Sequence, residues 1–328
     1  MNYNFLFIAA FLGSLIITVL VTPAVKKAAE KHKLLDAPAA RKVHKKPIPL
    51  GGGVAVYLGF FLTVLLLIAF IMFHSHGSFS VGNVAGTVNK LIGLFICGTT
   101  ILIIGLIDDK KNLSAKIKLL FQICIACALY YFGFSIDFIS LPQVKILYLN
   151  KGISLVLTLI WIVGLTNALN FLDGLDGLLC GVTAISAVAF AVITASKGQM
   201  AVTVLMLALA GSALGFLKYN FYPAKIFLGD GGSLFIGMVF SSLSIMGAFK
   251  VAATMVFIIP IIIMGIPIFD TTYAVTRRMF KGQSIFKADK EHLHHKLLNM
   301  GLSHKKVVLT IYIINALLCL FGLYIVFT

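Results

Sequence analysis

The sequence predicts an all-α protein that crosses a membrane about ten times and forms one integral-membrane domain over residues 1–328. Sixty per cent of the residues are hydrophobic, and the mean hydropathy is +1.03. Only 12% are charged, whereas soluble domains contain about 25% charged residues. The chain also contains ten apolar stretches, each about as long as the 20 residues that a bilayer core requires. Little of the chain remains for a soluble domain.

The ten predicted spans follow one another with short connections. The first, near residue 14, lacks a basic segment before it and a small-residue cleavage site after it, so we expect a retained span and not a signal peptide. In residues 135–150, apolar and polar residues tend to alternate on both sides of Leu141 and Pro142. This pattern predicts a short β-hairpin between two spans. The other spans are centred near residues 62, 98, 126, 161, 187, 208, 240, 262 and 317.

The loops on one side of the predicted bundle are strongly basic, with 22 of the 27 Lys and Arg residues. By the positive-inside rule this side is cytoplasmic, and both termini lie outside. The formal charge of +16 suits anionic lipid headgroups and phosphorylated ligands. No folded basic domain is left to bind nucleic acid. The expected cytoplasmic loops are about 25–50, 108–118, 170–178, 217–232 and 276–306.

Six of the eleven carboxylates lie near the ends of apolar spans on the basic side. Carboxylates close to hydrocarbon are costly and usually mark functional sites, so six at one membrane depth predict a shared site. A single acid would be explained better by a helix end or by pairing with a nearby lysine. The six are Asp108, Asp109, Asp173, Asp176, Asp230 and Asp270.

The segment 167–177, NALNFLDGLDG, follows a long apolar run. Asn167, Asn170, Asp173 and Asp176 recur every third residue, which would stack them on one face of a continued helix. The two glycines make continuation doubtful and would let the backbone turn close to a ligand. Oxygen donors without His or Cys suit Mg²⁺ or Mn²⁺ better than Zn²⁺. A helix cap explains one such residue but not four, so the segment predicts part of a magnesium site.

A second polar segment, IFLGDGGSLFIG at 226–237, places Asp230 among glycines at the start of an apolar span. A helix start of this kind directs backbone amides at one region and can bind a phosphate. Asp230 would then bind the metal beside it.

Basic residues accompany the acids in two further segments. In IDDKKNLSAKIKL, at 107–119, four lysines follow Asp108 and Asp109; they serve either as membrane anchors or, beside a metal, as phosphate ligands for phosphoryl transfer. In KEHLHHKL, at 290–297, the histidines lack a third zinc ligand at suitable spacing. Contacts to phosphate or sugar fit this basic segment better.

These segments, in this order, resemble the polyprenyl-phosphate N-acetylhexosamine-1-phosphate transferases, a membrane family (glycosyltransferase family 4) that includes MraY, WecA and TagO. The resemblance covers nearly the whole chain. The motifs are R-x-x-H…P-x-P-x-G-G (Arg41 to Gly52), Asp108-Asp109, N-x-x-N-F-x-D-G-x-D-G-L (Asn167 to Leu178), G-D-x-G-S-L-x-x-G (Gly229 to Gly237) and H-x-H-H (His292 to His295).

The resemblance implies a role for each matched residue. Asp108, Asp109 and Asp230 would be catalytic, and Asp230, Asn170 and Asp108 would hold Mg²⁺, with Mn²⁺ as the alternative ion. Phe227 would stack on uracil, although it serves equally well as an interfacial aromatic. Whether Asp108 is a base or a metal ligand stays open. The substrate-binding residues would be Lys118, Asn167, Asp173, Asp176, Phe227, Gly229, His292, His294, His295, Arg41 and His44.

The implied reaction transfers GlcNAc-1-phosphate from UDP-GlcNAc to undecaprenyl phosphate and releases UMP, as the first membrane step of a surface polymer such as teichoic acid or O-antigen. The segment HLHHKLLNMGLSHKK resembles the WecA/TagO branch. Transfer of phospho-MurNAc-pentapeptide in peptidoglycan synthesis is the alternative, because that branch also has ten spans. We expect a multi-pass protein of the cell membrane in contact with membrane lipid; a homodimer is one open oligomeric state.

An ion-coupled transporter is the competing class. It would place carboxylates along a path across the bilayer, whereas only Asp270 lies noticeably inside an apolar stretch. We therefore favour the enzyme.

Overall fold

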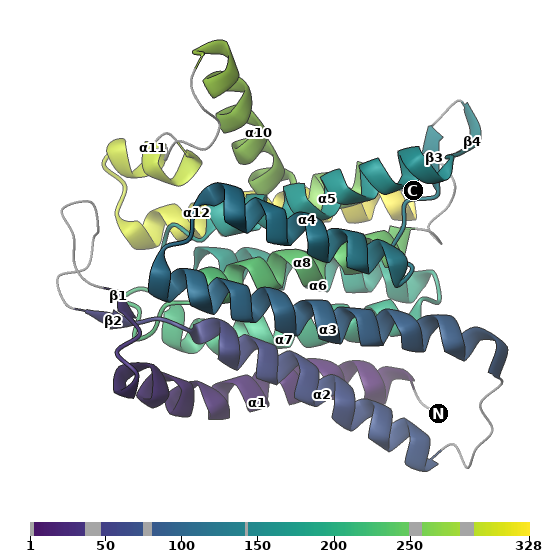
Figure 1. Ribbon diagram of the computed structural model, residues 1–328, viewed down its shortest axis with the longest axis horizontal. Helices are drawn as coiled ribbons and strands as arrows, with labels where there is room; N and C mark the ends of the chain where they lie inside the picture. Colours follow the sequence, from purple (N-terminus) through teal and green to yellow (C-terminus); the bar gives the residue numbers. More distant parts are fainter. Residues whose placement is uncertain (1–2, 37–46, 75–80, 142–143, 249–257, 283–291) are drawn as a thin grey trace.

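The computed structural model describes residues 3–36, 47–74, 81–141, 144–248, 258–282 and 292–328. The described chain is helical apart from two short strand pairs (Figure 1). The elements are α1 (Tyr3–Lys31), β1 (Leu35–Asp36), β2 (Ile48–Pro49), α2 (Gly52–His74), α3 (Val81–Lys111), α4 (Ala115–Tyr131), β3 (Phe138–Leu141), β4 (Val144–Tyr148), α5 (Lys151–Leu172), α6 (Leu178–Ser196), α7 (Met200–Asn220), α8 (Gly229–Ala248), α9 (Ile258–Ile263), α10 (Gly265–Phe280), α11 (Leu293–Asn299) and α12 (His304–Phe327).

Within these described ranges, eight helices are long and apolar enough to cross a membrane, namely α1, α2, α3, α5, α6, α7, α8 and α12. This confirms the predicted polytopic all-α class. The predicted span near residue 126 is α4, an apolar helix of 17 residues. The helices run back and forth in one bundle, and the two termini lie at the end opposite β1 and β2 (Figure 1).

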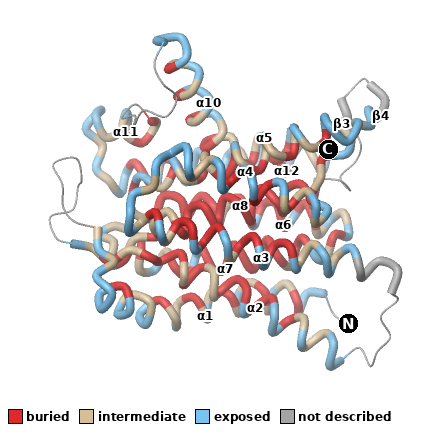
Figure 2. The backbone as a smooth tube through the Cα atoms, viewed as in Figure 1, coloured by how far each residue is buried: buried red, intermediate tan, exposed pale blue. Residues whose placement is uncertain are grey.

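Two helices form the centre of the bundle. In the apolar windows of α8 and α6, 83% and 78% of the residues are buried, compared with 28% in α1 and α12. Figure 2 shows that the buried residues are concentrated along the middle helices and that the exposed residues are more frequent on the outer ones. Because α8 is central, its first turn brings Asp230 into the interior of the bundle end.

The predicted span near residue 262 is broken into α9 and α10. Pro267 has no backbone N–H to donate to the carbonyl of Ile263, four residues earlier, so a continuous helix would lose a hydrogen bond here. The Ser186 hydroxyl donates to that carbonyl at 3.2 Å instead. After the break, α10 packs on α5, α9 and α12 and then points away from the bundle (Figure 1).

Two strand pairs close the connections at the bundle ends. The predicted hairpin is confirmed, since β3 and β4 pair antiparallel with Phe138 opposite Tyr148. At the other end, β1 pairs with β2, and Leu35 lies opposite Pro49. Residues 37–46, which include the predicted ligands Arg41 and His44, lie outside the described residues.

Candidate active site

A groove with a volume of about 1020 Å³ opens at the end of the bundle where α3 and α5 end and α8 begins. Five of the six predicted carboxylates line it, although they come from three separate segments of the sequence. Its lining consists of Asp36, Ile48, Leu50, Asp108, Asp109, Asn112, Asn170, Asp173, Gly174, Leu175, Asp176, Asn220, Tyr222, Pro223, Ala224, Phe227, Leu228, Gly229, Asp230, His295, Leu298, Asn299 and His304.

One lysine bridges two of the acids that line this groove. The ammonium of Lys118 lies 2.7 Å from Oδ2 of Asp108 and 3.1 Å from Oδ2 of Asp230. The other oxygen of Asp108 accepts the backbone N–H of Leu113 at 2.6 Å, which fixes the turn between α3 and α4. The Asp108 side chain is 4% exposed and that of Asp230 is 34% exposed. Asp230 is therefore the carboxylate of the pair that is more open to a ligand.

The asparagines of α5 have different partners. The Asn170 amide donates to Oδ1 of Asp230 at 2.9 Å and to the Ser233 hydroxyl at 2.7 Å. One turn earlier, Asn167 exchanges hydrogen bonds with Gln122 of α4, at 2.5 and 3.3 Å. Asn170 thus belongs to the acidic centre, whereas the structure places Asn167, a predicted substrate ligand, in an amide pair between α5 and α4.

Asp109 holds the start of α8. Its carboxylate accepts the backbone N–H of Asp230 at 2.8 Å and that of Gly231 at 3.4 Å. These are orphan donors of the first helical turn, and they are the amides expected to bind a phosphate. The structure corrects that expectation, because an internal carboxylate occupies the helix start. Asp109 positions Asp230 through the backbone.

The glycines of this segment allow close packing of helices. A Cβ on Gly105 of α3 would lie 2.3 Å from the Cα of Gly231, and a Cβ on Gly53 of α2 would lie 2.3 Å from the N of Gly232. Both would-be clashes involve backbone atoms, which cannot move aside as a flexible side chain can. The close approach of α3 to α8 is what brings Asp109 within reach of the Asp230 N–H.

The DGLDG turn follows the end of α5 and forms the next part of the groove. Asp173 caps the C-terminus of α5, and burial together with the neighbouring carboxylates Asp230, Asp109 and Asp176 raises its pKa well above the usual range. Oδ2 of Asp176 accepts the backbone N–H of Ala224 at 2.9 Å. The residues with the regular three-residue spacing therefore do not continue the helix. The hydrogen bond of Asp176 instead links the turn to the segment after α7.

The three predicted histidine ligands lie in different environments. Only His295 is among the groove residues. The Nδ1 of His292 lies 2.9 Å from Oδ2 of Asp270 on α10. His294 is 2% exposed, and its ring covers Gly174, where a Cβ would lie 2.5 Å from Nε2. Gly174, the first glycine of the DGLDG turn, thus leaves room for the His294 imidazole.

This buried histidine predicts a pH-dependent stability. Burial, followed by the neighbouring His295 and His292, lowers the pKa of His294 to about 3, against the smaller opposing effect of Asp270. The folded state therefore keeps His294 neutral, and its contribution is present above the unfolded pKa of about 6.5 and lost as the pH falls towards 3. Acidification from pH 7 to pH 5 should reduce the contribution of His294 to the unfolding free energy by about 2 kcal/mol. Carboxyl groups whose pKa is raised, such as Asp173, act in the opposite direction, so the His294 effect is the difference between the wild type and a variant without this imidazole.

The measurement is the unfolding midpoint of detergent-solubilised protein between pH 7 and pH 5. Residue 294 of His294→Gln cannot titrate in this interval, so the midpoint of the variant relative to that of the wild type should rise as the pH falls. An equal slope in the variant and the wild type would contradict this assignment.

Several groove residues were absent from the sequence prediction. Asn220 accepts the backbone N–H of Gly177 at 3.0 Å and donates to the carbonyl of Ile226 at 3.1 Å. Tyr222 stacks on His304 with ring centroids 4.4 Å apart. Asn220 ends the apolar run of α7 on the same side as the acids, so the rule that located the carboxylates would have found it. No short motif marks Tyr222 or His304.

The donor set fits a hard divalent cation. In the described part of the chain, no group of three or more His, Cys, Asp or Glu side chains forms a metal cage. However, the Lys118 ammonium stands between two carboxylates, which shows that a positive charge is accommodated there. Asp230, Asp108 and Asn170 offer oxygen donors, as Mg²⁺ prefers. These are the residues that would hold the ion.

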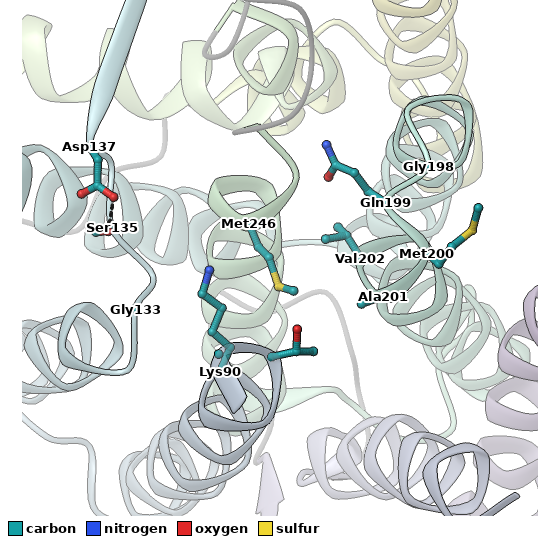
Figure 3. A pocket seen from close by; sticks show the side chains of 12 residues that line it. Lys90, Gly133, Ser135, Asp137, Gly198, Gln199, Met200, Ala201, Val202 and Met246 are labelled. Atoms are coloured by element: carbon teal, nitrogen blue, oxygen red, sulfur yellow. Dashed lines mark hydrogen bonds between the residues drawn. The ribbon is translucent and has the colours of Figure 1, made fainter. Parts of the chain in front are cut away.

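A second cavity, with a volume of about 390 Å³, is shown in Figure 3. Its lining includes residues of the connection between α4 and β3 and of the start of α7, at the other end of the bundle. Lys90 and Asp137 contribute its charged groups. The Asp137 carboxylate accepts hydrogen bonds from the hydroxyls of Ser135, at 2.9 Å, and Ser154, at 3.1 Å. This cavity is lined by a single carboxylate, whereas five of the predicted acids line the groove.

Comparison with known proteins agrees with this geometry. Residues 91–248 match the model of Glycosyl transferase family 4. The chain is 41% identical to a probable undecaprenyl-phosphate N-acetylglucosaminyl 1-phosphate transferase of Bacillus subtilis, over 94% of this chain and 82% of that protein. It is 35% identical to a decaprenyl-phosphate N-acetylglucosaminephosphotransferase of Mycobacterium leprae, over 92% and 79%.

A more distant relative belongs to the alternative branch. A phospho-N-acetylmuramoyl-pentapeptide-transferase of Bacillus mycoides is 31% identical, over 96% of this chain and 95% of that protein. The extent of these matches and the order of the groove residues lead to one conclusion: the chain belongs to glycosyl transferase family 4.

Proposed function

We propose that the protein transfers GlcNAc-1-phosphate from UDP-GlcNAc to undecaprenyl phosphate, giving undecaprenyl-pyrophosphoryl-GlcNAc and UMP. The single observation that carries this proposal is the cluster in which Lys118 pairs with both Asp108 and Asp230, while Asn170 donates to Asp230. The 41% identity to a protein named for this acceptor and this sugar supports the choice of donor.

In the reaction, an oxygen of the lipid phosphate attacks the β-phosphorus of UDP-GlcNAc. The bond from that phosphorus to the oxygen bridging it to the α-phosphorus breaks, and UMP leaves with that oxygen. Two polyanions must approach each other, so charge neutralisation is the main requirement. Lys118 supplies a fixed positive charge at the acidic centre, and a bound Mg²⁺ would supply more positive charge at the phosphates.

The chain's own groups have distinct parts in this step. Asp230 and Asn170 would hold the ion, Asp108 would either hold it or orient the acceptor phosphate, and Asp109 keeps Asp230 in place through the start of α8. A general base is not essential, since a phosphate monoester has a second pKa of about 6. Phe227, Asp173 and Asp176 would receive the nucleotide.

The proposed setting is the cell membrane, with the groove facing the cytoplasm. The groove lies at the bundle end that the predicted basic loops connect. In the sequence these loops contain 22 of the 27 Lys and Arg residues, which supports a cytoplasmic orientation. UDP-sugars are water-soluble and the polyprenol is not, so a groove at the membrane surface gives both substrates access. The product would begin the assembly of a lipid-linked surface polymer.

Removal of the metal and exchange of the donor test this proposal. Purified protein would be given undecaprenyl phosphate, Mg²⁺ and either UDP-GlcNAc or UDP-MurNAc-pentapeptide, and UMP release would be followed with and without EDTA. We expect release with UDP-GlcNAc alone, reduced to background by EDTA and restored by added Mg²⁺. Release only with the pentapeptide donor would refute the donor assignment, and no release with either would refute the enzyme.

A further inference from the structure

Asp270 is the one carboxylate of the predicted cluster that does not line the groove. It lies in α10, the helix that points away from the bundle (Figure 1), and its side chain is 9% exposed. A nearly buried carboxylate in an apolar setting is costly unless its oxygens are hydrogen-bonded. Its partners therefore indicate what it does.

Both oxygens of Asp270 bind the segment that begins α11. Oδ2 accepts a hydrogen bond from Nδ1 of His292 at 2.9 Å, and Oδ1 accepts the backbone N–H of Leu293 at 2.8 Å. Leu293 is the first residue of α11, and the N-cap residue His292 makes no side-chain capping bond of its own. Asp270 thus caps α11 from another helix and selects the His292 tautomer that carries its proton on Nδ1.

The position of α11 determines one wall of the groove. The helix has seven residues, too few to be stable without tertiary contacts. Its residues His295, Leu298 and Asn299 line the groove. The Lys296 ammonium of α11 also lies 4.4 Å from the ring centroid of Tyr273 on α10.

We propose that Asp270 is a positioning residue that docks α11 against the groove and thereby sets the affinity for the nucleotide sugar. This inference rests on the proposed function for the identity of the ligand. The wall adjoins the DGLDG turn, because the ring of His294 covers Gly174 and that turn carries Asp173 and Asp176. The acidic centre, by contrast, is held by α3, α4, α5 and α8.

The two parts of the groove predict a separation of kinetic effects. Without the Asp270 carboxylate, α11 loses a capping bond and a side-chain anchor, and His295 is no longer held against the groove. The KM for UDP-GlcNAc should rise, whereas kcat at saturating donor should change little, since the Asp108, Lys118 and Asp230 contacts remain. A residue that merely supports the fold would instead lower the amount of active enzyme and leave KM unchanged.

The test compares Asp270→Ala, Asp270→Asn and the control Asp137→Asn in the full-length protein. Asp137 also receives two hydrogen bonds but lies at the other end of the bundle. We expect Asp270→Ala to raise the KM for UDP-GlcNAc about tenfold or more, the factor that corresponds to loss of a charge-assisted hydrogen bond. Asp270→Asn keeps an acceptor for the Leu293 N–H and should show a smaller rise. Asp137→Asn should match the wild type.

Hydrogen exchange provides a readout that does not depend on activity. The backbone amides of residues 293–304 should exchange faster in Asp270→Ala than in the wild type, because a helix end without its cap opens more often. Faster exchange should be absent from Asp137→Asn. This measurement keeps the inference testable even if Asp270→Ala is produced in reduced amounts.

Two results would overturn the inference. One is unchanged exchange of 293–304 in Asp270→Ala, and the other is a fall in kcat at constant KM. Failure of the proposed function is distinguishable from both, because wild-type protein would then release no UMP from UDP-GlcNAc although the exchange difference between variants would persist.

Discussion

Asp230→Asn is expected to lower kcat for UMP release by about three orders of magnitude, the upper range for loss of one electrostatic contact to a transition state. The Asp230 carboxylate is the more open acid of the centre and contacts both Lys118 and Asn170. Asparagine keeps the shape and one acceptor oxygen but removes the negative charge that a divalent cation requires. The measurement is the UMP release rate at saturating UDP-GlcNAc and Mg²⁺.

Folding is controlled in the same experiment by the unfolding midpoint. The backbone N–H of residue 230 still donates to Asp109 in the variant, so the start of α8 should remain in place and the midpoint should change little. Asp137→Asn, the same substitution at the other bundle end, should retain full activity. An Asp230→Asn enzyme with more than a tenth of the wild-type rate would contradict a role in the reaction.

Gly105→Ala is expected to force α3 and α8 apart and to destabilise the fold. The added methyl group would lie 2.3 Å from the Cα and 2.5 Å from the N of Gly231. Both are backbone atoms, so α3 and α8 must separate, and the bonds from Asp109 to the start of α8 must lengthen or break. We expect a loss of about 3 kcal/mol in unfolding free energy, at the upper end for an overpacked interior, together with most of the activity.

Gly164→Ala provides the matched control. Gly164 lies in the interior of α5, and a Cβ there would meet no atom within 4 Å. Alanine has a better helix propensity than glycine by up to about 1 kcal/mol, so this variant should be as stable as the wild type or more stable. Equal unfolding midpoints for the two variants would contradict the packing role of Gly105.

The sequence predicted the end of the bundle at which the groove lies because membrane depth is encoded locally. An apolar run of fixed length places its polar end at the bilayer surface, so Asp108, Asp173 and Asp230 could be assigned to one level without knowledge of helix packing. Asn220 also lies at the polar end of an apolar run, at the end of α7. It was overlooked because no other predicted site residue lies next to it in the sequence. The helical class followed from the same apolar runs.

The partners of these residues were not predictable, because they depend on which helices are neighbours. Asn167 and Asn170 look equivalent in the sequence, yet one pairs with Gln122 and the other with Asp230. Asp109 binds backbone amides that were expected to bind phosphate. One continuous span was predicted near residue 262, whereas the helix breaks before Pro267, and the hydroxyl that donates to the freed carbonyl of Ile263 belongs to Ser186 of α6.

The most direct test of the central claim is to follow the β-phosphate of the donor. UDP-GlcNAc labelled with ³²P in the β-phosphate would be incubated with the protein, Mg²⁺ and undecaprenyl phosphate, and the lipid and aqueous phases would then be separated. Transfer of a sugar-1-phosphate predicts label in the lipid phase and unlabelled UMP in the water. Label recovered in aqueous UDP, with GlcNAc alone on the lipid, would contradict the account.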